Sequence, residues 1–342
     1  MMRTVELQEF LSSGLPMLDV RSPGEYMDGH VINAFNLPLL DNTNRELIGI
    51  CYKHKGQEAA IKLGYELVNP IKETFIQELE NVSDHKNISL YCARGGLRSH
   101  KMAEFLSAAG YDVLILKGGY KTYRNHILQT IRKFRNIMIL SGHTGSGKTE
   151  VLGELSKLGC QVLDLEALAN HKGSVFGALG NKPQPSSGHF HNLIYQSLKS
   201  FSPESPLWVE NESVTIGKVY QPKELWENML LANGYEIVLP LSERVKFTLE
   251  NYGNFDIESL VHCIQALSKR LGDESCRQLC ELTEQNKLEP VVERLFKYYD
   301  KAYENGREKR NCQKFVKISF DAFDAKKIAA FLHDQSQNNS NN

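Results

Sequence analysis

NIMILSGHTGSGKT, residues 136–149, decides how the second half of the chain folds. An apolar run precedes G-x-x-x-x-G-K-T, and the amphipathic stretch TEVLGELSKLG follows it. A buried strand that enters a glycine-rich loop and leaves as a helix binds phosphate oxygens through backbone N–H groups and the helix N-terminus. We therefore expect a phosphate-binding loop (P-loop), in which Lys148 supplies positive charge and Thr149 is a candidate ligand for Mg²⁺. Its expected phosphate-binding glycines are Gly142, Gly145 and Gly147.

Acidic residues that follow the next strands complete a site of this kind. QVLDLEALANHKGS supplies Asp164 and Glu166, and PLWVENES supplies Glu210 and Glu212. Each is a candidate to orient a metal ion or a substrate. Asp164 is also a candidate N-cap for a helix that begins at LEALAN. For Glu210, the alternative to a role in the site is a purely structural role.

Short apolar runs alternate with amphipathic stretches along the chain, which is typical of α/β proteins with parallel sheets. We expect a first domain over residues 1–130, a P-loop domain with a helical C-terminal part over 131–334, and a disordered polar tail over 335–342. Helical spacing without a clear strand marks residues 255–305. The expected strands are residues 16–20, 88–92, 112–116, 136–140, 160–165, 207–211, 235–241 and 314–320.

The composition limits the classes of protein to consider. The 342 residues have a formal charge of -1 and contain 41% hydrophobic residues, enough for two ordinary cores. A nucleic-acid partner would therefore be held by local basic patches. The seven cysteines are scattered without paired C-x-x-C spacings, which favours reduced thiols over disulfides or zinc. The N-terminus has no signal-length apolar stretch, so we expect a cytoplasmic protein without a membrane segment.

A second anion-binding loop is expected at YCARGGLRSH, residues 91–100. The apolar run ISLYC delivers Cys92 into a loop that opens a helix, and Arg94 and Arg98 add positive charge. Backbone N–H groups and a helix N-terminus around the sulfur favour its thiolate, so Cys92 is a candidate nucleophile. The alternative is an inert buried cysteine at a strand end. The expected supporting residues are Gly95, Gly96, Ser99, Asp19 and Arg21.

Four segments of the first domain resemble the rhodanese family over residues 4–130. They are LDVRSPGEY, GHVINAFNLPL, YCARGGLRS and LILKGGY. In the first, Ser22, Pro23 and Glu25 also form a capping-box pattern that predicts a short helix. The resemblance implies a rhodanese-like α/β domain whose loop cysteine carries sulfur or selenium as a persulfide-type adduct. Sulfurtransferases of the rhodanese family usually have a loop one residue shorter than the C-x5-R of this chain. The C-x5-R spacing is the one that phosphatases use.

A stretch without acidic residues lies around the domain boundary. Residues 113–149 contain no aspartate or glutamate but carry several lysines and arginines with interleaved tyrosine and phenylalanine, which suits a bound polyanion. A solvated basic linker is the alternative. The candidate nucleic-acid-binding residues are Lys117, Lys121, Arg124, Arg132, Lys133 and Arg135.

Further segments extend the resemblance to about residue 330. LLDNTNRELIGICYKHKGQEAAIKLGYELV, YCARGGLRS, GHTGSGKTEVL, DLEALANHKGSVFGALG and PLWVENESVTIGKVYQP together resemble the bacterial tRNA 2-selenouridine synthase family. The resemblance implies a transferase that alkylates the C2 sulfur of a wobble 5-substituted 2-thiouridine with geranyl diphosphate, and then replaces that sulfur by selenium from selenophosphate. It implies tRNA as partner, Cys92 as selenium carrier and a selenophosphate-producing enzyme as supplier.

Two other function classes are compatible with the two loops. A C-x5-R phosphatase coupled to a small-molecule P-loop kinase would release phosphate from aryl phosphates, but it leaves the acid-free stretch unexplained. A non-catalytic anion sensor would use degenerate loops, whereas Cys92, Lys148 and Thr149 are all present.

Overall fold

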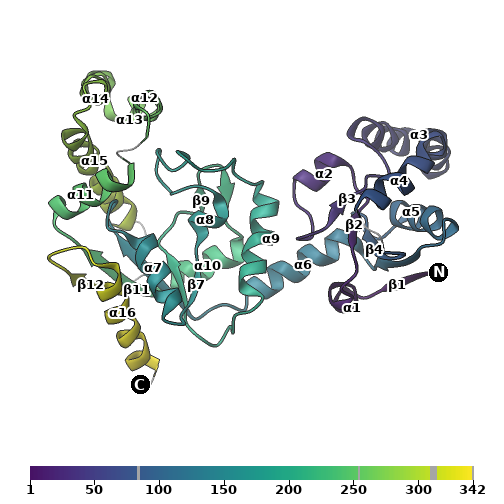
Figure 1. The fold of residues 1–342 in the computed structure, drawn as a ribbon, viewed down its shortest axis with the longest axis horizontal. Coiled ribbons are helices and arrows are strands. Elements are labelled where there is room, and N and C mark those ends of the chain that lie inside the picture. Colours follow the sequence, from purple (N-terminus) through teal and green to yellow (C-terminus); the bar gives the residue numbers. More distant parts are fainter. Residues whose placement is uncertain (83–84, 253–254, 309–313, 341–342) are drawn as a thin grey trace. The chain divides into compact units, whose positions relative to one another are not determined.

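The computed structural model describes residues 1–82, 85–252, 255–308 and 314–340 (Figure 1). The chain folds into two compact units. The first comprises Met1–Gln129 together with Ser186–Leu193, and the second comprises Thr130–Pro185 and Ile194–Asn342. The first unit thus ends one residue before the expected boundary, but it also recruits an eight-residue segment from the second half of the sequence. That segment was not expected.

The first unit is built on a five-stranded parallel sheet in the order β1-β5-β4-β2-β3. Its strands are β1 (Met2–Val5), β2 (Met17–Asp19), β3 (Phe35–Asn36), β4 (Asn87–Tyr91) and β5 (Asp112–Leu116). Its helices are α1 (Leu7–Ser12), α2 (Pro23–Met27), α3 (Asn42–Val68), the 3-10 turn η1 (Asn69–Ile71), α4 (Lys72–Val82), α5 (Leu97–Ala108) and most of α6 (Gly119–Ile131).

Strand register sets the position of the loop after β4. Asp19 at the end of β2 pairs with Tyr91 at the end of β4, and the Val20 N–H donates to the Tyr91 carbonyl at 3.0 Å. Because both strands are parallel, they end at the same edge of the sheet, where α/β proteins bind their ligands. The residues after Asp19 and after Tyr91 therefore lie next to each other.

The second unit contains another five-stranded parallel sheet, in the order β12-β11-β6-β8-β7. Its strands are β6 (Ile137–Gly142), β7 (Gln161–Leu163), β8 (Leu207–Glu210), β11 (Asn233–Val238) and β12 (Phe315–Ser319), with an antiparallel pair β9 (Thr215–Ile216) and β10 (Val219–Tyr220). Its helices are α7 (Lys148–Lys157), α8 (Leu165–Ala169), the end of α9 (Ser187–Leu198), α10 (Lys223–Leu231), α11 (Leu241–Tyr252), α12 (Ile257–Gln265), α13 (Ser268–Leu271), α14 (Asp273–Glu284), α15 (Leu288–Glu308) and α16 (Ala325–Ser340).

The helical part of the second unit has a core of its own. Apolar side chains repeat at three- and four-residue spacing on α12, α14 and α15, so each helix presents one apolar face to the others. The buried side chains of this cluster are Ile264, Leu267, Cys276, Leu279, Val291 and Leu295. This core fixes helices that, as described below, form one wall of a cavity.

All eight expected strands are present, with ends that differ by at most three residues from those expected. The prediction of a disordered tail from residue 335 differs from the structure, in which α16 continues through Ser340. The helix is anchored by the fully buried Ile328, Ala329 and Leu332, and the Ser336 hydroxyl donates to the His333 carbonyl at 2.7 Å. Residues 341–342 lie outside the described residues. Among the described residues, no helix is both long and apolar enough to cross a bilayer.

Candidate active site in each unit

Cys92 lies directly after β4, and its side chain is enclosed. The residue is 3% exposed, its thiol donates to the Ser99 hydroxyl at 3.3 Å, and that hydroxyl donates to the Gly96 carbonyl at 2.8 Å. Helix α5 begins at Leu97, so the N-terminus of a twelve-residue helix closes the loop, as expected. A helix N-terminus binds anions through its backbone N–H groups. A substrate that reaches the sulfur must displace part of this loop.

Two glycines after β5 support the cysteine loop through direct backbone contact. The Tyr120 N–H donates to the Cys92 carbonyl at 2.8 Å. An added Cβ at Gly119, which has φ 59°, would collide with that same carbonyl, and one at Gly95, with φ 63°, would lie 2.6 Å from the Gly118 nitrogen. Both positions thus require glycine for close approach as well as for positive φ. The segment LKGGY is therefore part of the site.

Arg98, the arginine of the C-x5-R spacing, is bound to a carboxylate. Its guanidinium donates to both Glu25 oxygens, at 2.5 and 3.0 Å, and Glu25 also accepts the Ser22 N–H at 3.2 Å as the capping pattern predicts. Burial raises the pKa of Glu25, but the hydrogen bonds and charge of Arg98 outweigh it and lower that pKa to about 2. Arg94 is exposed.

Asp19 and Arg21 form a buried ion pair beside the loop. The Arg21 guanidinium donates to Asp19 at 2.5 Å and to the Gly29 carbonyl at 2.6 Å, and it stacks 3.9 Å from the Tyr120 ring centre. Asp19 is fully buried and Arg21 is 4% exposed. Breaking a buried pair of this kind is costly, so the pair holds the ends of β2 and of the glycine segment in place.

The P-loop of the second unit has the expected strand–loop–helix form. β6 ends at Gly142, and α7 begins at Lys148 after Gly147, whose φ is 64°. The Lys148 ammonium donates to the Gly142 carbonyl at 3.2 Å and pairs with Glu210 at the same distance. The register of β6 with β8 explains this pair, because Glu210 lies opposite Leu140, two residues before the loop.

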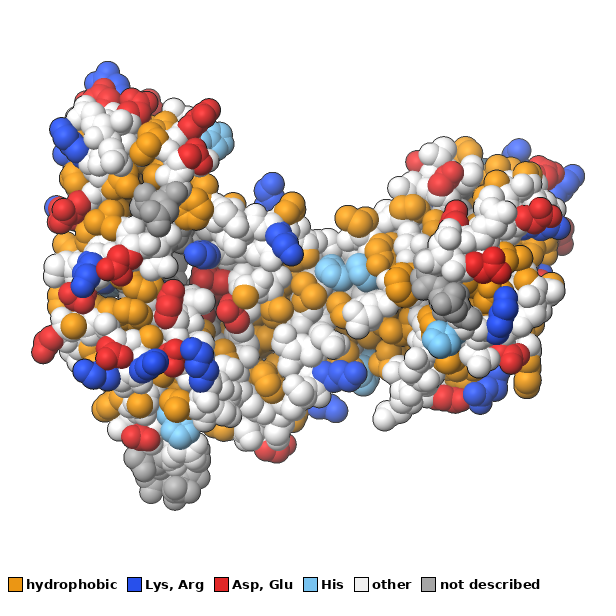
Figure 2. All heavy atoms as spheres, in the orientation of Figure 1, with side chains coloured by type: hydrophobic (Ala, Val, Ile, Leu, Met, Phe, Trp, Pro, Cys, Tyr) orange, Lys and Arg blue, Asp and Glu red, His pale blue; other side chains and the backbone are white. Residues whose placement is uncertain are grey.

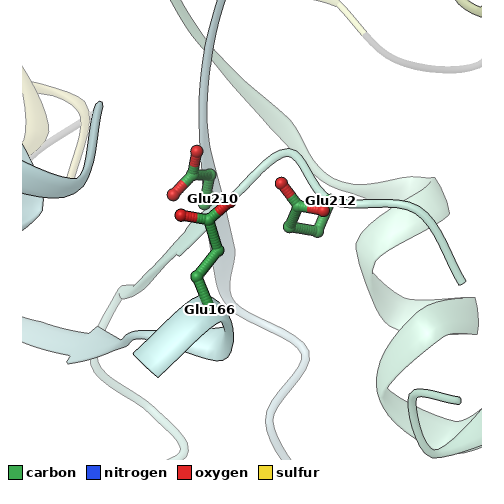
Figure 3. A group of neighbouring side chains, drawn as sticks. All are labelled: Glu166, Glu210 and Glu212. Atoms are coloured by element: carbon green, nitrogen blue, oxygen red, sulfur yellow. The ribbon is translucent and has the colours of Figure 1, made fainter. Parts of the chain in front are cut away.

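Three carboxylates converge beside the P-loop (Figure 3). Glu166 comes from α8, Glu210 ends β8, and Glu212 lies in the segment that follows; one ligand oxygen from each lies within 4.8 Å of the others. The Thr149 hydroxyl is 3.4 Å from both Glu166 and Glu210. An added Cβ at Gly173 would lie within 3 Å of two of these carboxylates, so the loop that carries it closes over them.

Burial and mutual repulsion raise the pKa of these acids. Burial is the main cause for Glu166, whose pKa rises to about 9 with help from the charges of Glu210 and Glu212. Burial together with Glu210 raises the pKa of Glu212 to about 7. Burial also raises the pKa of Glu210, against the opposing charge of Lys148. When all three acids are ionised, the cluster carries more negative charge than Lys148 neutralises, which suits a divalent cation.

A cavity of about 480 Å³ joins the P-loop to the helical part of the second unit. Part of its lining is polar and contains Lys148, Thr149 and the three carboxylates. The rest is mainly an apolar wall formed by α11, α12, α15 and a segment after α8. This apolar wall includes Phe176, Phe247, Ile264, Val291, Leu295 and Phe296. The volume is in the range of small-molecule sites, and the lining suits a ligand with an anionic head and a hydrocarbon body.

Both halves of the chain match known families. Residues 4–126 match the rhodanese-like domain, and residues 135–339 match the family described as tRNA 2-selenouridine synthase AAA domain. A protein of Shewanella sediminis called tRNA 2-selenouridine synthase is 35% identical, with 92% of this chain and 94% of that protein covered. The chain belongs to the tRNA 2-selenouridine synthase family.

Other members of the tRNA 2-selenouridine synthase family show the same relationship. Those of Sulfurovum sp. and Nitrosomonas europaea are 33% and 38% identical, covering 96% and 72% of this chain and 97% and 66% of theirs. Among solved structures, the N-terminal domain of a putative ATP/GTP binding protein from Clostridium difficile 630 is 37% identical and covers 37% of this chain and 99% of its own, with a TM-score of 0.35.

The acids of this family member divide into a cap and a cluster. The Asp164 carboxylate accepts the Ala167 N–H at 2.9 Å and caps α8, as the alternative interpretation proposed. Glu166 and Glu210 enter the cluster. Sequence reasoning named Glu212 only as part of a pair with Glu210, and its convergence with Glu166 depends on the turn after β8. The helices that form the apolar cavity wall carried no motif that assigned them to the site.

The basic candidates of the acid-free stretch have different environments. Arg124 is half-buried and donates to Asn192 Oδ1 at 2.8 Å and to the Gly188 carbonyl at 3.2 Å, within the recruited segment of the first unit. Lys117 is exposed and pairs with Glu6 at 2.5 Å. The exposed remainder is Lys121, Arg132, Lys133 and Arg135. On the face shown in Figure 2, basic and acidic side chains are interspersed over both units.

Proposed function

We propose that this protein is a tRNA 2-selenouridine synthase that first geranylates and then selenates the wobble 5-substituted 2-thiouridine of tRNA. The observation that carries the proposal is the cavity of about 480 Å³, whose lining combines phosphate-binding groups with an apolar wall. Geranyl diphosphate has that same division into a diphosphate and a ten-carbon chain. A nucleotide has a polar base and ribose in place of the chain and matches this wall less well.

In the first step, the P-loop amides and Lys148 bind the diphosphate and stabilise it as it leaves. The thiouridine sulfur forms a bond to C1 of the geranyl group, the C1–O bond breaks with its electrons on diphosphate, and N3 of the base releases a proton. The apolar wall holds the chain. The sulfur becomes a thioether, which leaves C2 far more readily than a thiocarbonyl sulfur does.

The carboxylate cluster fits Mg²⁺ in this step. Thr149, Glu166 and Glu210 supply hard oxygen donors within reach of one another, and Glu212 adds a further charge. When bound, the ion would neutralise charge that builds up on diphosphate. The raised pKa values of Glu166 and Glu212 are the state of the cluster without a cation.

In the second step, selenium from selenophosphate takes the place of geranylthiol. The C2–S bond breaks, sulfur leaves with its electron pair and gains a proton, a C2–Se bond forms, and water cleaves the P–Se bond to release phosphate. Selenium stays at the selenide level throughout, so no oxidant is consumed. A selenophosphate-producing enzyme must supply the donor. We place this step at Cys92, with Arg94 and the loop amides as the anion-binding groups.

Oxidation state separates two roles for Cys92. A selanylsulfide on Cys92 holds selenium two electrons more oxidised than selenophosphate, so this carrier route takes an oxidant on loading and a thiol on discharge. In the other route the Cys92 thiolate attacks C2 and releases geranylthiol, which forms a thioether between Cys92 and tRNA. Selenophosphate then displaces the Cys92 sulfur from C2. This route needs neither an oxidant nor a second thiol. We favour the second route because it balances. An adduct trapped on Cys92 carries tRNA in this route and selenium alone in the other.

The test is mass spectrometry of nucleosides from bulk tRNA incubated with enzyme, geranyl diphosphate and selenophosphate. We expect wild type to form 2-selenouridine, Cys92→Ala to stop at the geranylated or thio form, and Lys148→Ala to form neither product. Lys157→Ala, on the exposed end of α7, is the control and should behave as wild type. If wild type changes no tRNA nucleoside with any donor, the proposal fails, and phosphate release from aryl phosphates becomes the activity to measure.

A further inference from the structure

A second cavity, of about 360 Å³, lies in the first unit beside the cysteine loop. It lies between α3, including the C-terminal end of that helix at Val68, and the start of α5, and its lining is mainly apolar. Leu97 and Arg98, the first two residues of the helix that closes the cysteine loop, form part of its wall. Leu39, Leu40 and Val68 line the cavity and also belong to the core cluster that contains Cys92.

The sequence builds this cavity with a broken helix. Asp41 caps α3 by accepting the Asn44 N–H at 2.7 Å, and Gly56, with φ 83°, interrupts the helix. The two arms come together at Gly64, where an added Cβ would touch the Ile48 side chain at 3.6 Å. The arms therefore form a helical hairpin over the first unit, with the cavity between the hairpin and α5.

The mouth of the cavity has apolar side chains that the fold leaves in water. Tyr52 is 59% exposed and Leu97 is 45% exposed. Lys101 pairs with Glu104 at 2.7 Å and lies 5.5 Å from the Tyr65 ring centre, so the rim also carries charge. A concave apolar surface with a charged rim is typical of a site for a hydrocarbon group attached to a polar molecule.

We propose that this cavity holds the geranyl chain of S-geranylated tRNA while selenium replaces sulfur at Cys92. The inference rests on the proposed function. The chain starts at the sulfur on C2, so a base that reacts at Cys92 carries the chain to within its own length of that residue, on the order of 10 Å for carbon–carbon bonds of about 1.5 Å. The cavity is adjacent to Cys92 in the fold, because Leu97 and Arg98 in its wall begin the helix that closes the cysteine loop, and Leu39, Leu40 and Val68 pack in the same core cluster as Cys92.

Two prenyl sites then serve the two steps. The cavity at the P-loop takes the chain while it is still on diphosphate, and the cavity beside Cys92 takes it while it is on tRNA and as geranylthiol. Burial of apolar carbon in the second cavity favours the S-geranyl nucleoside over a shorter S-alkyl nucleoside, although the leaving sulfur is chemically similar. The enzyme thereby prefers the geranylated tRNA to tRNAs that carry shorter S-alkyl groups.

The test compares selenation of purified S-geranyl tRNA with selenation of S-methyl tRNA under single-turnover conditions. For wild type at subsaturating enzyme we expect the single-turnover rate constant to favour the geranyl substrate by at least a hundredfold. Ala60→Phe fills the cavity and Tyr52→Asp puts a charge at its mouth. Both should reduce the preference by at least tenfold while the S-methyl rate and the geranylation of 2-thiouridine by geranyl diphosphate stay unchanged. His54→Asp, an exposed neighbour that does not line the cavity, is the matched control for Tyr52→Asp.

Each other outcome has a definite meaning. If both cavity variants keep the wild-type preference, the cavity does not hold the chain. If Leu295→Phe at the P-loop cavity abolishes the preference instead, one site serves both steps and the inference is overturned. If Tyr52→Asp changes the oligomeric state in solution without changing the preference, the cavity is an interface between copies of the chain. If wild type forms no 2-selenouridine from S-geranyl tRNA, the proposed function itself fails.

Discussion

Glu25 holds the Arg98 guanidinium through two hydrogen bonds, although 73 positions separate them in the sequence. The arginine that defines the C-x5-R spacing is thus directed and partly neutralised by a residue of the first helix after β2. In a phosphatase loop this arginine must be available to a phosphate ion. Here the carboxylate competes for it, so we expect Arg98 to act by positioning the loop around Cys92.

Glu25→Gln should therefore destabilise the protein by roughly 1–3 kcal/mol at pH 7, because it leaves a half-buried guanidinium without its charged partner. The pKa of Glu25, about 2, lies below its ordinary 4.5, so the pair stabilises the fold above about pH 4.5 and this contribution is lost as pH falls toward 2. Urea unfolding at several pH values measures the difference. Glu9→Gln, which breaks the exposed pair with Arg3, should cost less than about 1 kcal/mol; equal costs would contradict the assignment.

Gly147→Ala should damage the P-loop. Gly147 has φ 64°, and an added Cβ would collide with the Phe323 ring, so we expect a loss of more than about 1 kcal/mol and of geranylation. Gly153→Ala in α7 is the control, because nothing lies within 4 Å of the added Cβ, and it should stabilise the helix by about 0.5–1 kcal/mol. Thermal unfolding of both variants checks the prediction. A lower Tm for Gly147→Ala and a higher Tm for Gly153→Ala would support it, and a change of the same sign in both would contradict it.

The carboxylate cluster predicts a stability that falls with pH. The pKa values of Glu166 and Glu212, about 9 and about 7, lie above the ordinary 4.5, so the folded state retains protons that the unfolded chain releases. The free energy of unfolding therefore falls as pH rises from about 4.5 to about 9. Glu166→Gln should flatten this dependence in Tm measurements. Mg²⁺ should raise the Tm more at pH 8 than at pH 6, since it binds the deprotonated acids; no difference would argue against the cluster as its site.

Asn192 should be essential for the stability of the first unit. It is fully buried, and its amide donates to the His30 carbonyl at 2.8 Å and to the Tyr120 hydroxyl at 2.7 Å while accepting from Arg124. Asn192→Ala removes the amide that binds the His30 carbonyl and the Tyr120 hydroxyl and one of the acceptors of Arg124, so we expect a loss of about 3 kcal/mol. The exposed Asn125→Ala should change the free energy of unfolding by less than about 0.5 kcal/mol. Chemical denaturation measures both, and similar values would refute the assignment.

Much of the fold follows from local sequence. Apolar runs bounded by glycine and polar residues located every expected strand, and the P-loop pattern located β6, the loop and α7 because the spacing itself dictates the backbone. The short strands β1 and β3 were not predicted, because two to four residues are too few to show a hydrophobic pattern. The continuation of α16 beyond residue 334 was not predicted, because the polar composition of the tail does not show that the preceding turns are anchored by the buried Ile328 and Leu332.

The parts of the site that the sequence did not predict depend on contacts between distant residues. The Glu25–Arg98 pair, the convergence of Glu166 with Glu212 and the contact of Gly119 with the Cys92 carbonyl all join segments whose own patterns are satisfied without one another. The two cavities also depend on such contacts. Leu295 and Leu39 look like ordinary core residues in the sequence, and only the packing of their helices shows which face a cavity.

Helix α9 belongs to both units, since Ser187–Leu193 pack with the first and Ile194–Leu198 with the second. This has a consequence for synthesis on the ribosome. The first unit is discontinuous in the chain, so it can close around Asn192 only after that residue has left the exit tunnel, when the P-loop and β7 have already been made. The nascent N-terminal half stays incomplete until a segment encoded more than fifty codons downstream of its own last strand has been synthesised. A gene fragment that stops at the apparent domain boundary therefore encodes a first unit without this segment.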